Sequence, residues 1–550
     1  MYPRGLIRFI RKKISVPRFD AELRSSTPGN EFFLKGGNAM GKNKYLLVVM
    51  VLAIWPIVHF SSTEAPAASP QGTLKQANHY TISADYLDPA TCSNAKHAFE
   101  VMYFFHDALV KTTASGLSTP SLAESWSISP DAKVYEFNLR KGVKFHNGDT
   151  MTADDVVFSF QRYKSAHAKF IQDKIEKLEA VSPHLVRIHF KEPFPDLLEY
   201  LVPGATSIAW IVPKKYVEKV GDAGFRKQPV GCGPYKFVEF ETGVKVVGEA
   251  FEGYWRKMPH IKRIEILTIP EPSTRLAMVM RGEVDMASSV QAVLHASVKK
   301  DPKVRIHPSC SSTIWLVQMT NQWDPKSPWS DVRVRKAASL AIDRKTLVDV
   351  HMPGAIPVGT IGSDEDPLVV NIPADPYDPE KARKLLAEAG YPNGFHGGTF
   401  YPYNGLLWPY SEQVANYWKA IGITLDSRLM DRAALLAHRR AGKMKGSTFI
   451  MGSSPPIVGM RLSYLFQDTP YGNYPDILAL WGQYNKAIDP KIRKDLIGRI
   501  QNLIYEKVMY LPLTSTSTLY ALGPRVKGDP WKNERVLGFP SSFEDMEVVD

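Results

Sequence analysis

The chain has 550 residues, of which 44% are hydrophobic and 23% charged, and this length exceeds what one compact core holds, so we expect two or three packed units. The formal net charge is +12, and the first 67 residues supply half of it, with ten Lys or Arg and four Asp or Glu. Because the other basic residues form no dense run, the composition argues against a nucleic-acid-binding protein.

Residues 40–67 have the order of a secretory signal peptide. A short positive stretch begins at Met40, residues 45–58 are mostly apolar, and Ala65-Pro-Ala67 gives the small-x-small pattern of a cleavage site. The apolar run is shorter than the roughly twenty residues that a transmembrane helix needs. We therefore predict export through a signal peptide that starts near Met40 and a mature protein that begins near Ala68; an uncleaved membrane anchor is the alternative.

Residues 1–39 stand before this signal, although a signal peptide belongs at the N-terminus of a precursor. They are basic and carry no convincing core pattern. We interpret them as an upstream extension and expect translation to start at Met40, which N-terminal sequencing of the precursor would test.

Helix and strand signals alternate along the rest of the chain, which is typical of an α/β protein. We predict a helix over 94–109, a strand of alternating apolar and polar residues over 135–139, and a hairpin over 181–190. Thr152-Ala-Asp-Asp155 has the spacing of a capping box and predicts the start of another helix.

The second half carries the clearest helix signals. Asp378-Pro-Glu380 supplies an N-cap and a proline in the first turn, and Gly390 supplies the stop, so we predict a helix between them. Further helices are expected over 411–421 and 492–508, and a strand over 423–429. The chain has no short internal repeat, which excludes a solenoid.

The sequence lacks the short motifs of common enzyme sites, namely the G-x-S-x-G elbow, the H-E-x-x-H helix and the P-loop. In Gly231-Cys-Gly-Pro234 the proline is incompatible with a phosphate-binding loop, and no base for Cys232 is identifiable. Cys92, Cys232 and Cys310 contain no C-x-x-C pair and allow at most one disulfide within the chain, so their pairing stays open. We therefore predict a protein with no catalytic residue, no metal ligand and no cofactor.

Seven stretches of the chain follow one another in a recognisable order: 120–126 (Pro-Ser-Leu-Ala-Glu-Ser-Trp), 137–148, 152–158, 231–237 (Gly-Cys-Gly-Pro-Tyr-Lys-Phe), 273–285, 331–344 and 377–386. In this order they resemble the signature of the family 5 extracellular solute-binding proteins, the peptide- and nickel-type receptors of ABC importers. The resemblance extends over about residues 74–513. Each stretch alone is a weak signal, and the ordered set is specific.

The resemblance implies a two-lobed periplasmic binding protein fold of the class II type, with an extra subdomain on lobe I. By analogy, lobe I takes residues 74–117, 229–312 and 512–550. Its subdomain takes residues 118–228, and lobe II takes residues 313–511.

The resemblance also implies a function. It is that of a periplasmic substrate-binding protein of an ABC importer, which captures a peptide or another small organic solute by hinge closure about two chain crossings, near Ser312 and Leu511. The expected partners are that solute and an ABC permease of the inner membrane, and we expect a monomer. Three alternatives stay open: a membrane-anchored sensor with the same fold, an extracytoplasmic hydrolase, and a binder of oligosaccharide-like ligands.

One departure from the family concerns the loop in which peptide receptors carry an Asp. The corresponding stretch, Phe449 to Pro456, holds no acid, so a peptide ammonium group would lack its countercharge there. The uncharged aromatic stretch 401–410 suits sugar rings or apolar groups, unless its rings only pack lobe II. Nickel is not favoured as the ligand, because the sequence offers no cluster of His and acidic residues to bind it. The candidate ligand-binding residues are Thr91, Cys92, Ser93, Trp315, Met319, Asn321, Tyr401, Tyr403, Trp408, Gly452, Ser453 and Ser454.

Overall fold

The computed structural model describes most of the chain from residue 69 to residue 549, all of it within one unit, Ala65–Asp550. The expected extension and signal peptide, as well as Ser93 and Ser454, lie outside the described residues. In the part of the chain that is described, no helix has both the length and the apolar character needed to cross a membrane. The residues not described are 1–68, 93–95, 114, 203–207, 292–293, 295–297, 299–300, 310–312, 363–365, 404–407, 431, 454–456, 468–470, 533–541 and 550.

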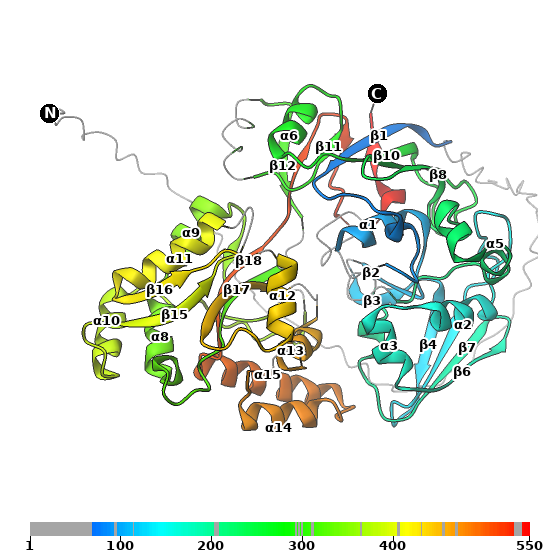
Figure 1. Ribbon diagram of the computed structural model, residues 1–550. Coiled ribbons are helices and arrows are strands. Elements are labelled where there is room, and N and C mark those ends of the chain that lie inside the picture. Colours follow the sequence, from blue (N-terminus) through cyan, green and yellow to red (C-terminus); the bar gives the residue numbers. More distant parts are fainter. Residues whose placement is uncertain are drawn as a thin grey trace, which may run out of the picture. The chain divides into compact units, whose positions relative to one another are not determined.

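The prediction of an α/β protein is confirmed, and the first of its three larger sheets joins segments from both ends of the chain (Figure 1). This seven-stranded sheet is mixed, because β1 runs parallel to β10 and β11 while the outer pairs are antiparallel. Its order is β12 (Arg305–Pro308), β19 (Leu519–Leu522), β11 (Met286–Ala287), β1 (Gln71–Asn78), β10 (Ile261–Thr268), β9 (Lys245–Ala250) and β8 (Tyr235–Glu241). Its helices are α1 (Lys96–Phe105) and α6 (Pro272–Met280), and η1 (Ala84–Leu87) precedes α1.

A four-stranded antiparallel sheet is built entirely from residues between 123 and 190. Its order is β4 (Ala123–Ile128), β5 (Val134–Leu139), β7 (Leu185–Phe190) and β6 (Ile175–Ser182). The predicted alternation holds on β5, where every second side chain is buried. The predicted capping box is also present at α2 (Ala153–Arg162), where the Asp155 carboxylate accepts from the Thr152 backbone N–H at 2.8 Å. The neighbouring elements are β2 (Val110–Thr113), β3 (Gly116–Pro120), α3 (Ala166–Gln172), α4 (Leu197–Tyr200) and α5 (Lys214–Lys227).

The third, six-stranded sheet has helices on both faces, each over its own apolar cluster (Figure 1). Its order is β14 (Ile356–Pro357), β18 (Tyr510–Thr516), β13 (Thr313–Met319), β17 (Ser447–Ser453), β15 (Phe395–Tyr401) and β16 (Ile423–Ser427). One cluster includes residues of α8 (Val332–Leu340), α9 (Arg344–His351), α10 (Pro379–Glu388) and α11 (Trp408–Ala420). The other includes residues of α12 (Arg432–Arg440), α13 (Val458–Gln467), α14 (Pro475–Tyr484) and α15 (Pro490–Glu506).

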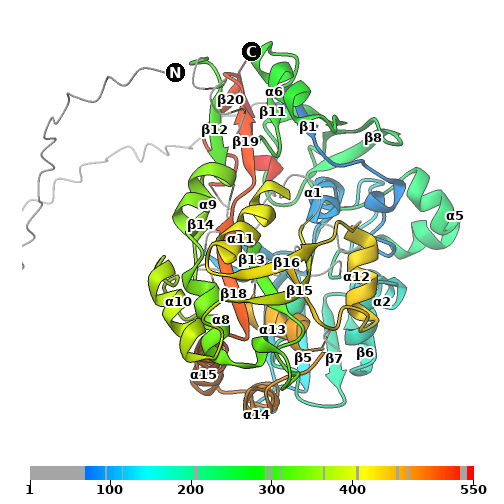
Figure 2. The same cartoon turned by 60° about the vertical axis from the view of Figure 1, so that its left-hand side comes forward.

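Two short connections join the six-stranded sheet to the seven-stranded sheet. Residues 309–312 lead from β12 to β13, and residues 517–518 lead from β18 to β19, so the orange and red strands follow one another in Figure 2. The described ends of the two connections lie side by side, because the backbone N–H of Ser309 donates to the carbonyl of Thr518 at 2.8 Å. β18 extends to Thr516, so the second connection lies a few residues after the crossing expected near Leu511.

Candidate functional site

An aromatic corner forms at the end of the six-stranded sheet next to these connections. Trp315 of β13 pairs with Gly452 of β17, and its ring meets the ring of Tyr403 edge-on, with 4.8 Å between centroids. The Trp315 indole N–H donates to the Thr516 hydroxyl at 2.9 Å. Both rings are only partly buried, so apolar surface next to the connections is open to a solute.

Gly452 makes this corner possible. A Cβ atom at position 452 would lie 3.1 Å and 3.2 Å from two ring carbons of Trp315, and 3.1 Å from the methyl group of Thr313. The indole therefore lies directly over the backbone of β17, and any side chain at 452 would displace it. The pattern of the sequence had suggested Trp315, Tyr403 and Gly452 separately, and the structure brings them together.

The other candidate ligand-binding residues of this region lie in or next to the six-stranded sheet, outside the aromatic corner. Met319 is fully buried in the cluster beneath α8–α11, and Tyr401 packs against the opposite cluster. Ser453 also faces that opposite side, since neighbouring residues of a strand alternate, and its hydroxyl is buried without a hydrogen-bond partner. The side-chain carbonyl of Asn321 is likewise buried without a partner, while Trp408 is partly buried at the first position of α11.

The segment around Thr91 and Cys92 comes from the other side of the molecule and is held by a buried charge. The backbone N–H groups of both residues donate to the carbonyl of Asp88, at 3.2 Å and 3.0 Å. The fully buried carboxylate of Asp88 accepts two hydrogen bonds from Arg162 of α2, at 2.6 Å and 2.7 Å. This bidentate pair holds the turn that begins at Asp88 in place. The Thr91 hydroxyl belongs to the same turn and is buried without a hydrogen-bond partner.

The sequence reasoning missed Asp88 and Arg162. They are far apart in the chain, and the only available signal is that Arg162 follows the buried Ser159 by three residues and so falls near the buried side of α2. It also missed Arg461 of α13, which is fully buried and donates to the carbonyl of Ser453. Burial lowers the pKa of Arg461 to about 9, so this guanidinium remains charged at neutral pH.

The buried thiols do not have the character of nucleophiles. Burial, reinforced by Asp85 and Asp88, raises the pKa of Cys92 to about 12, and burial raises the pKa of Cys232 well above its usual value. His146 lies in a turn and is partly buried: its ring accepts from the N–H of Gly231 and contacts the carbonyl of Gly233 at 3.0 Å. It thus fastens the backbone on both sides of Cys232.

The glycines of this segment have a direct structural reason. A Cβ atom at Gly231 would lie 2.0 Å from the carbonyl oxygen of Phe105, and one at Gly233 would lie 2.7 Å from the backbone nitrogen of His106. The segment therefore packs backbone to backbone against the end of α1. This close approach accounts for the two glycines of the Gly-Cys-Gly-Pro sequence.

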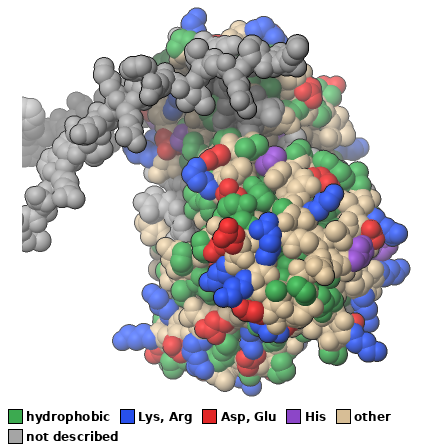
Figure 3. All heavy atoms as spheres, turned by 90° about the vertical axis from the view of Figure 1, so that its left-hand side faces the viewer, with side chains coloured by type: hydrophobic (Ala, Val, Ile, Leu, Met, Phe, Trp, Pro, Cys, Tyr) green, Lys and Arg blue, Asp and Glu red, His purple; other side chains and the backbone are tan. Residues whose placement is uncertain are grey.

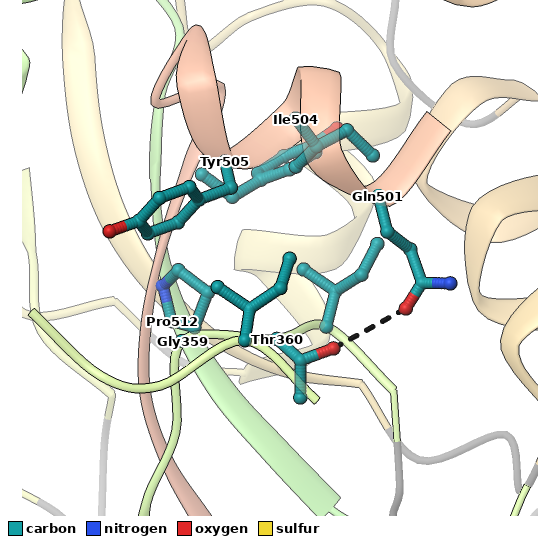
Figure 4. A pocket seen from close by; sticks show the side chains of 9 residues that line it. Gly359, Thr360, Gln501, Ile504, Tyr505 and Pro512 are labelled. Carbon is teal, nitrogen blue, oxygen red and sulfur yellow. Dashed lines mark hydrogen bonds between the residues drawn. The ribbon is translucent and has the colours of Figure 1, made fainter. Parts of the chain in front are cut away.

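A metal site and the small pocket of Figure 4 are both less suitable candidates for the functional site than the aromatic corner. Among the described residues no three His, Cys, Asp or Glu side chains are grouped so that they could hold a metal ion. The pocket of Figure 4, lined by Thr360, Gln501 and Tyr505 among others, is too small for an organic solute. On the face of the molecule in Figure 3, positive and negative side chains are interspersed, which is unlike the stripe of one sign that binds nucleic acid.

Comparison with protein families and curated proteins gives consistent matches. The family described as bacterial extracellular solute-binding proteins, family 5 Middle, matches residues 118–473. Heme-binding protein A of Haemophilus influenzae is 29% identical over 451 residues, which cover 74% of this chain and 81% of that protein. Glutathione-binding protein GsiB of Shigella boydii is 30% identical over 461 residues, which cover 78% of this chain and 85% of that protein.

Solved structures show the same fold. HbpA2 from Haemophilus parasuis superposes with a TM-score of 0.74 at 24% identity, covering 87% of this chain and all of that one. DppA from Helicobacter pylori, in complex with the peptide STSA, superposes with a TM-score of 0.70 at 23% identity, covering 87% of this chain and 98% of that one. The architecture of two sheet-containing halves is therefore shared with periplasmic binding proteins.

Proposed function

We propose a function for this chain from one premise: the chain belongs to the family 5 bacterial extracellular solute-binding proteins. It is a non-enzymatic substrate-binding protein that captures a small solute for an ABC importer. Members of this family are periplasmic or extracellular. We propose that this chain reaches that compartment through the signal peptide starting near Met40 and acts there as a monomer.

The paired connections between the two large sheets are the proposed hinge for closure. Because the two connections are only a few residues long and Ser309 is hydrogen-bonded to Thr518, we propose that rotation about them moves one half of the protein against the other. We assign lobe I to the seven-stranded sheet with its four-stranded subdomain, and lobe II to the six-stranded sheet. A solute that contacts both lobes stabilises the closed conformation by its differential affinity for that state.

We propose that the solute lies between the aromatic corner of lobe II and the Thr91 segment of lobe I. The rings of Trp315 and Tyr403 offer partly exposed apolar surface, and the Thr91 hydroxyl offers a polar group. This combination fits a small organic solute with a flat or apolar part. The relatives that bind heme and glutathione make those two compounds suitable first probes.

The test is a binding panel of heme, reduced glutathione and dipeptides, measured by tryptophan fluorescence on the mature protein. We expect at least one probe to bind with saturation, to decrease the radius of gyration in small-angle X-ray scattering, and to be recovered chemically unchanged. Turnover of a bound probe would overturn the proposal. So would a scattering curve that stays the same at saturation.

A further inference from the structure

Besides the paired connections, the two lobes meet at a contact that involves none of the proposed solute-binding residues. Asp196, directly before α4 in the subdomain of lobe I, forms an ion pair with Arg493 of α15 in lobe II. The same guanidinium nitrogen of Arg493 also donates to the hydroxyl of Tyr484 of α14. The hydroxyl of Tyr484 in turn lies within 3.5 Å of the Asp196 carboxylate. The three side chains form one closed group across the lobes.

Arg493 is held in place by lobe II alone. Its second terminal nitrogen donates to the carbonyls of Tyr484 and Ala487, at 3.3 Å and 3.1 Å, and its guanidinium lies 4.1 Å from the centre of the Tyr484 ring. These contacts do not depend on lobe I. Lobe II therefore presents a preorganised cation, and lobe I supplies only the carboxylate of Asp196.

The contact is sealed from water. Arg493 is 6% exposed, Asp196 is 9% exposed and Tyr484 is fully buried. Close by, the Tyr200 hydroxyl of α4 hydrogen-bonds to Ser463 of α13. Ile457 and Met460, from the same part of lobe II, belong to the apolar cluster that contains Leu197 and Tyr200 of lobe I, which are buried. The buried carboxyl groups of Glu199 and Asp366 also lie near Tyr484, and a buried ion pair in such surroundings depends strongly on its geometry.

We propose that Asp196, Tyr484 and Arg493 form a closure latch, through which the subdomain of lobe I holds lobe II in the closed conformation. When the lobes part about the paired connections, Asp196 leaves Arg493 and both charges return to water. The inference rests on the hinge of the proposed function. It gives the four-stranded subdomain a role in closure in addition to any contact with the solute.

Loss of the latch should raise the free energy of the closed conformation and leave that of the open conformation unchanged. Removal of the Asp196 charge leaves a buried guanidinium without its counterion in the closed conformation, but costs nothing in the open one, where Arg493 is hydrated. The substitution therefore shifts the equilibrium between the two conformations more than it affects folding. Asp196→Asn is the cleaner variant, because substitution of Arg493 would also leave the carbonyls of Tyr484 and Ala487 without a donor.

The experiment compares Asp196→Asn with Asp173→Asn, which removes an exposed carboxylate of the same subdomain that pairs with Lys169. Two readouts are used: small-angle scattering of the ligand-free mature protein, and the dissociation rate of the tightest-binding probe of the panel. We expect Asp196→Asn to enlarge the ligand-free radius of gyration or to raise the dissociation rate at least tenfold, with an unchanged urea unfolding midpoint. Asp173→Asn should change neither.

Scattering curves that coincide for the two variants, together with equal dissociation rates, would overturn the latch. A loss of folding stability in Asp196→Asn without any change in shape or rate would also overturn it, because the contact would then be a fixed part of the fold. If no probe of the panel binds, the binding proposal fails while the scattering comparison alone still decides the latch.

Discussion

The two segments that we propose to face the solute are held by different forces. The Thr91 segment of lobe I is fixed by a buried ion pair between Asp88 and Arg162, whereas the corner of lobe II rests on the packing of Trp315 against Tyr403 and the backbone at Gly452. A buried charge becomes costly once its partner is removed, but rings of a half-open corner lose contact area gradually. The Thr91 segment of lobe I should therefore respond to substitution by a loss of folding stability, and the aromatic corner of lobe II by altered binding.

The strongest test of this contrast is Arg162→Met. It removes the bidentate partner of the fully buried Asp88 carboxylate and leaves only the more distant guanidinium of Arg226, at 3.9 Å, so we expect a loss of about 3 kcal/mol in the free energy of unfolding, measured by urea denaturation. Lys164→Met is the matched control, since Lys164 is largely exposed and pairs with Asp222 at the surface, where such a pair contributes at most about 1 kcal/mol. Equal losses in the two variants would contradict the contrast.

The next largest effect is expected from pH, through Glu199 of α4 beside the latch. Burial and the nearby charge of Asp366 raise the pKa of Glu199 to about 8, and burial raises the pKa of Asp366 as well. In the open conformation a hydrated Glu199 has its usual pKa near 4.5, so closure takes up a proton between these two values. Closure is therefore favoured at low pH, and this advantage is lost as the pH rises through about 8.

We expect the affinity for a probe whose own charge is constant over this range to fall on the order of fiftyfold from pH 6 to pH 8. Glu199→Gln should flatten the profile. Four other groups that face this site do not titrate here: burial lowers the pKa of Arg461 only to about 9 and that of Arg493 only to about 10, and it raises the pKa values of Tyr200 and Tyr484. Burial also raises the pKa of Asp366, which adds to the same trend. An equally steep profile in Glu199→Gln would assign the pH dependence to another group.

Local patterns in the sequence predicted the individual elements well. The helix after Asp378 begins and ends as expected, because its N-cap carboxylate, its proline and the positive φ of Gly390 act within a few residues of one another. The alternation on β5 is equally local. Such signals depend only on neighbours in the chain, so one sequence is enough to read them.

The contacts that position the site are not local, and the sequence alone could not predict them. Asp88 meets Arg162 between lobe I and its own subdomain, and Asp196 meets Arg493 between the two lobes, and no spacing in the sequence records these meetings. Trp315 was a candidate because it follows the chain crossing expected near Ser312, and Tyr403 because it belongs to an aromatic stretch, but the packing of Trp315 over Gly452 follows from strand register. Side-chain type thus indicated the chemistry, and topology decided which residues meet.

On the lobe II side of the contrast, Trp315→Ala should lower the affinity for a bound probe about tenfold, or about 1.4 kcal/mol, through loss of ring contact. Trp408→Ala is expected to have a similar effect if the aromatic stretch after Tyr401 also contacts the solute. Fluorescence titration measures both, and circular dichroism checks that the fold is intact. A loss confined to Trp315 would limit the site to the corner, and no loss in either variant would remove the corner from it.

The smallest expected effect comes from the addition of one methyl group. Gly452→Ala places a Cβ atom about 3.1 Å from the Trp315 ring, so the indole must move by a few tenths of an ångström, and we expect a two- to threefold loss of affinity, an estimate on the order of 0.5 kcal/mol. Gly482→Ala is the control, because a Cβ atom there in α14 meets open space and should only stabilise the helix. If Gly452→Ala instead lowered stability and left affinity unchanged, the corner would be a structural element of lobe II, and the contrast between the lobes would not hold.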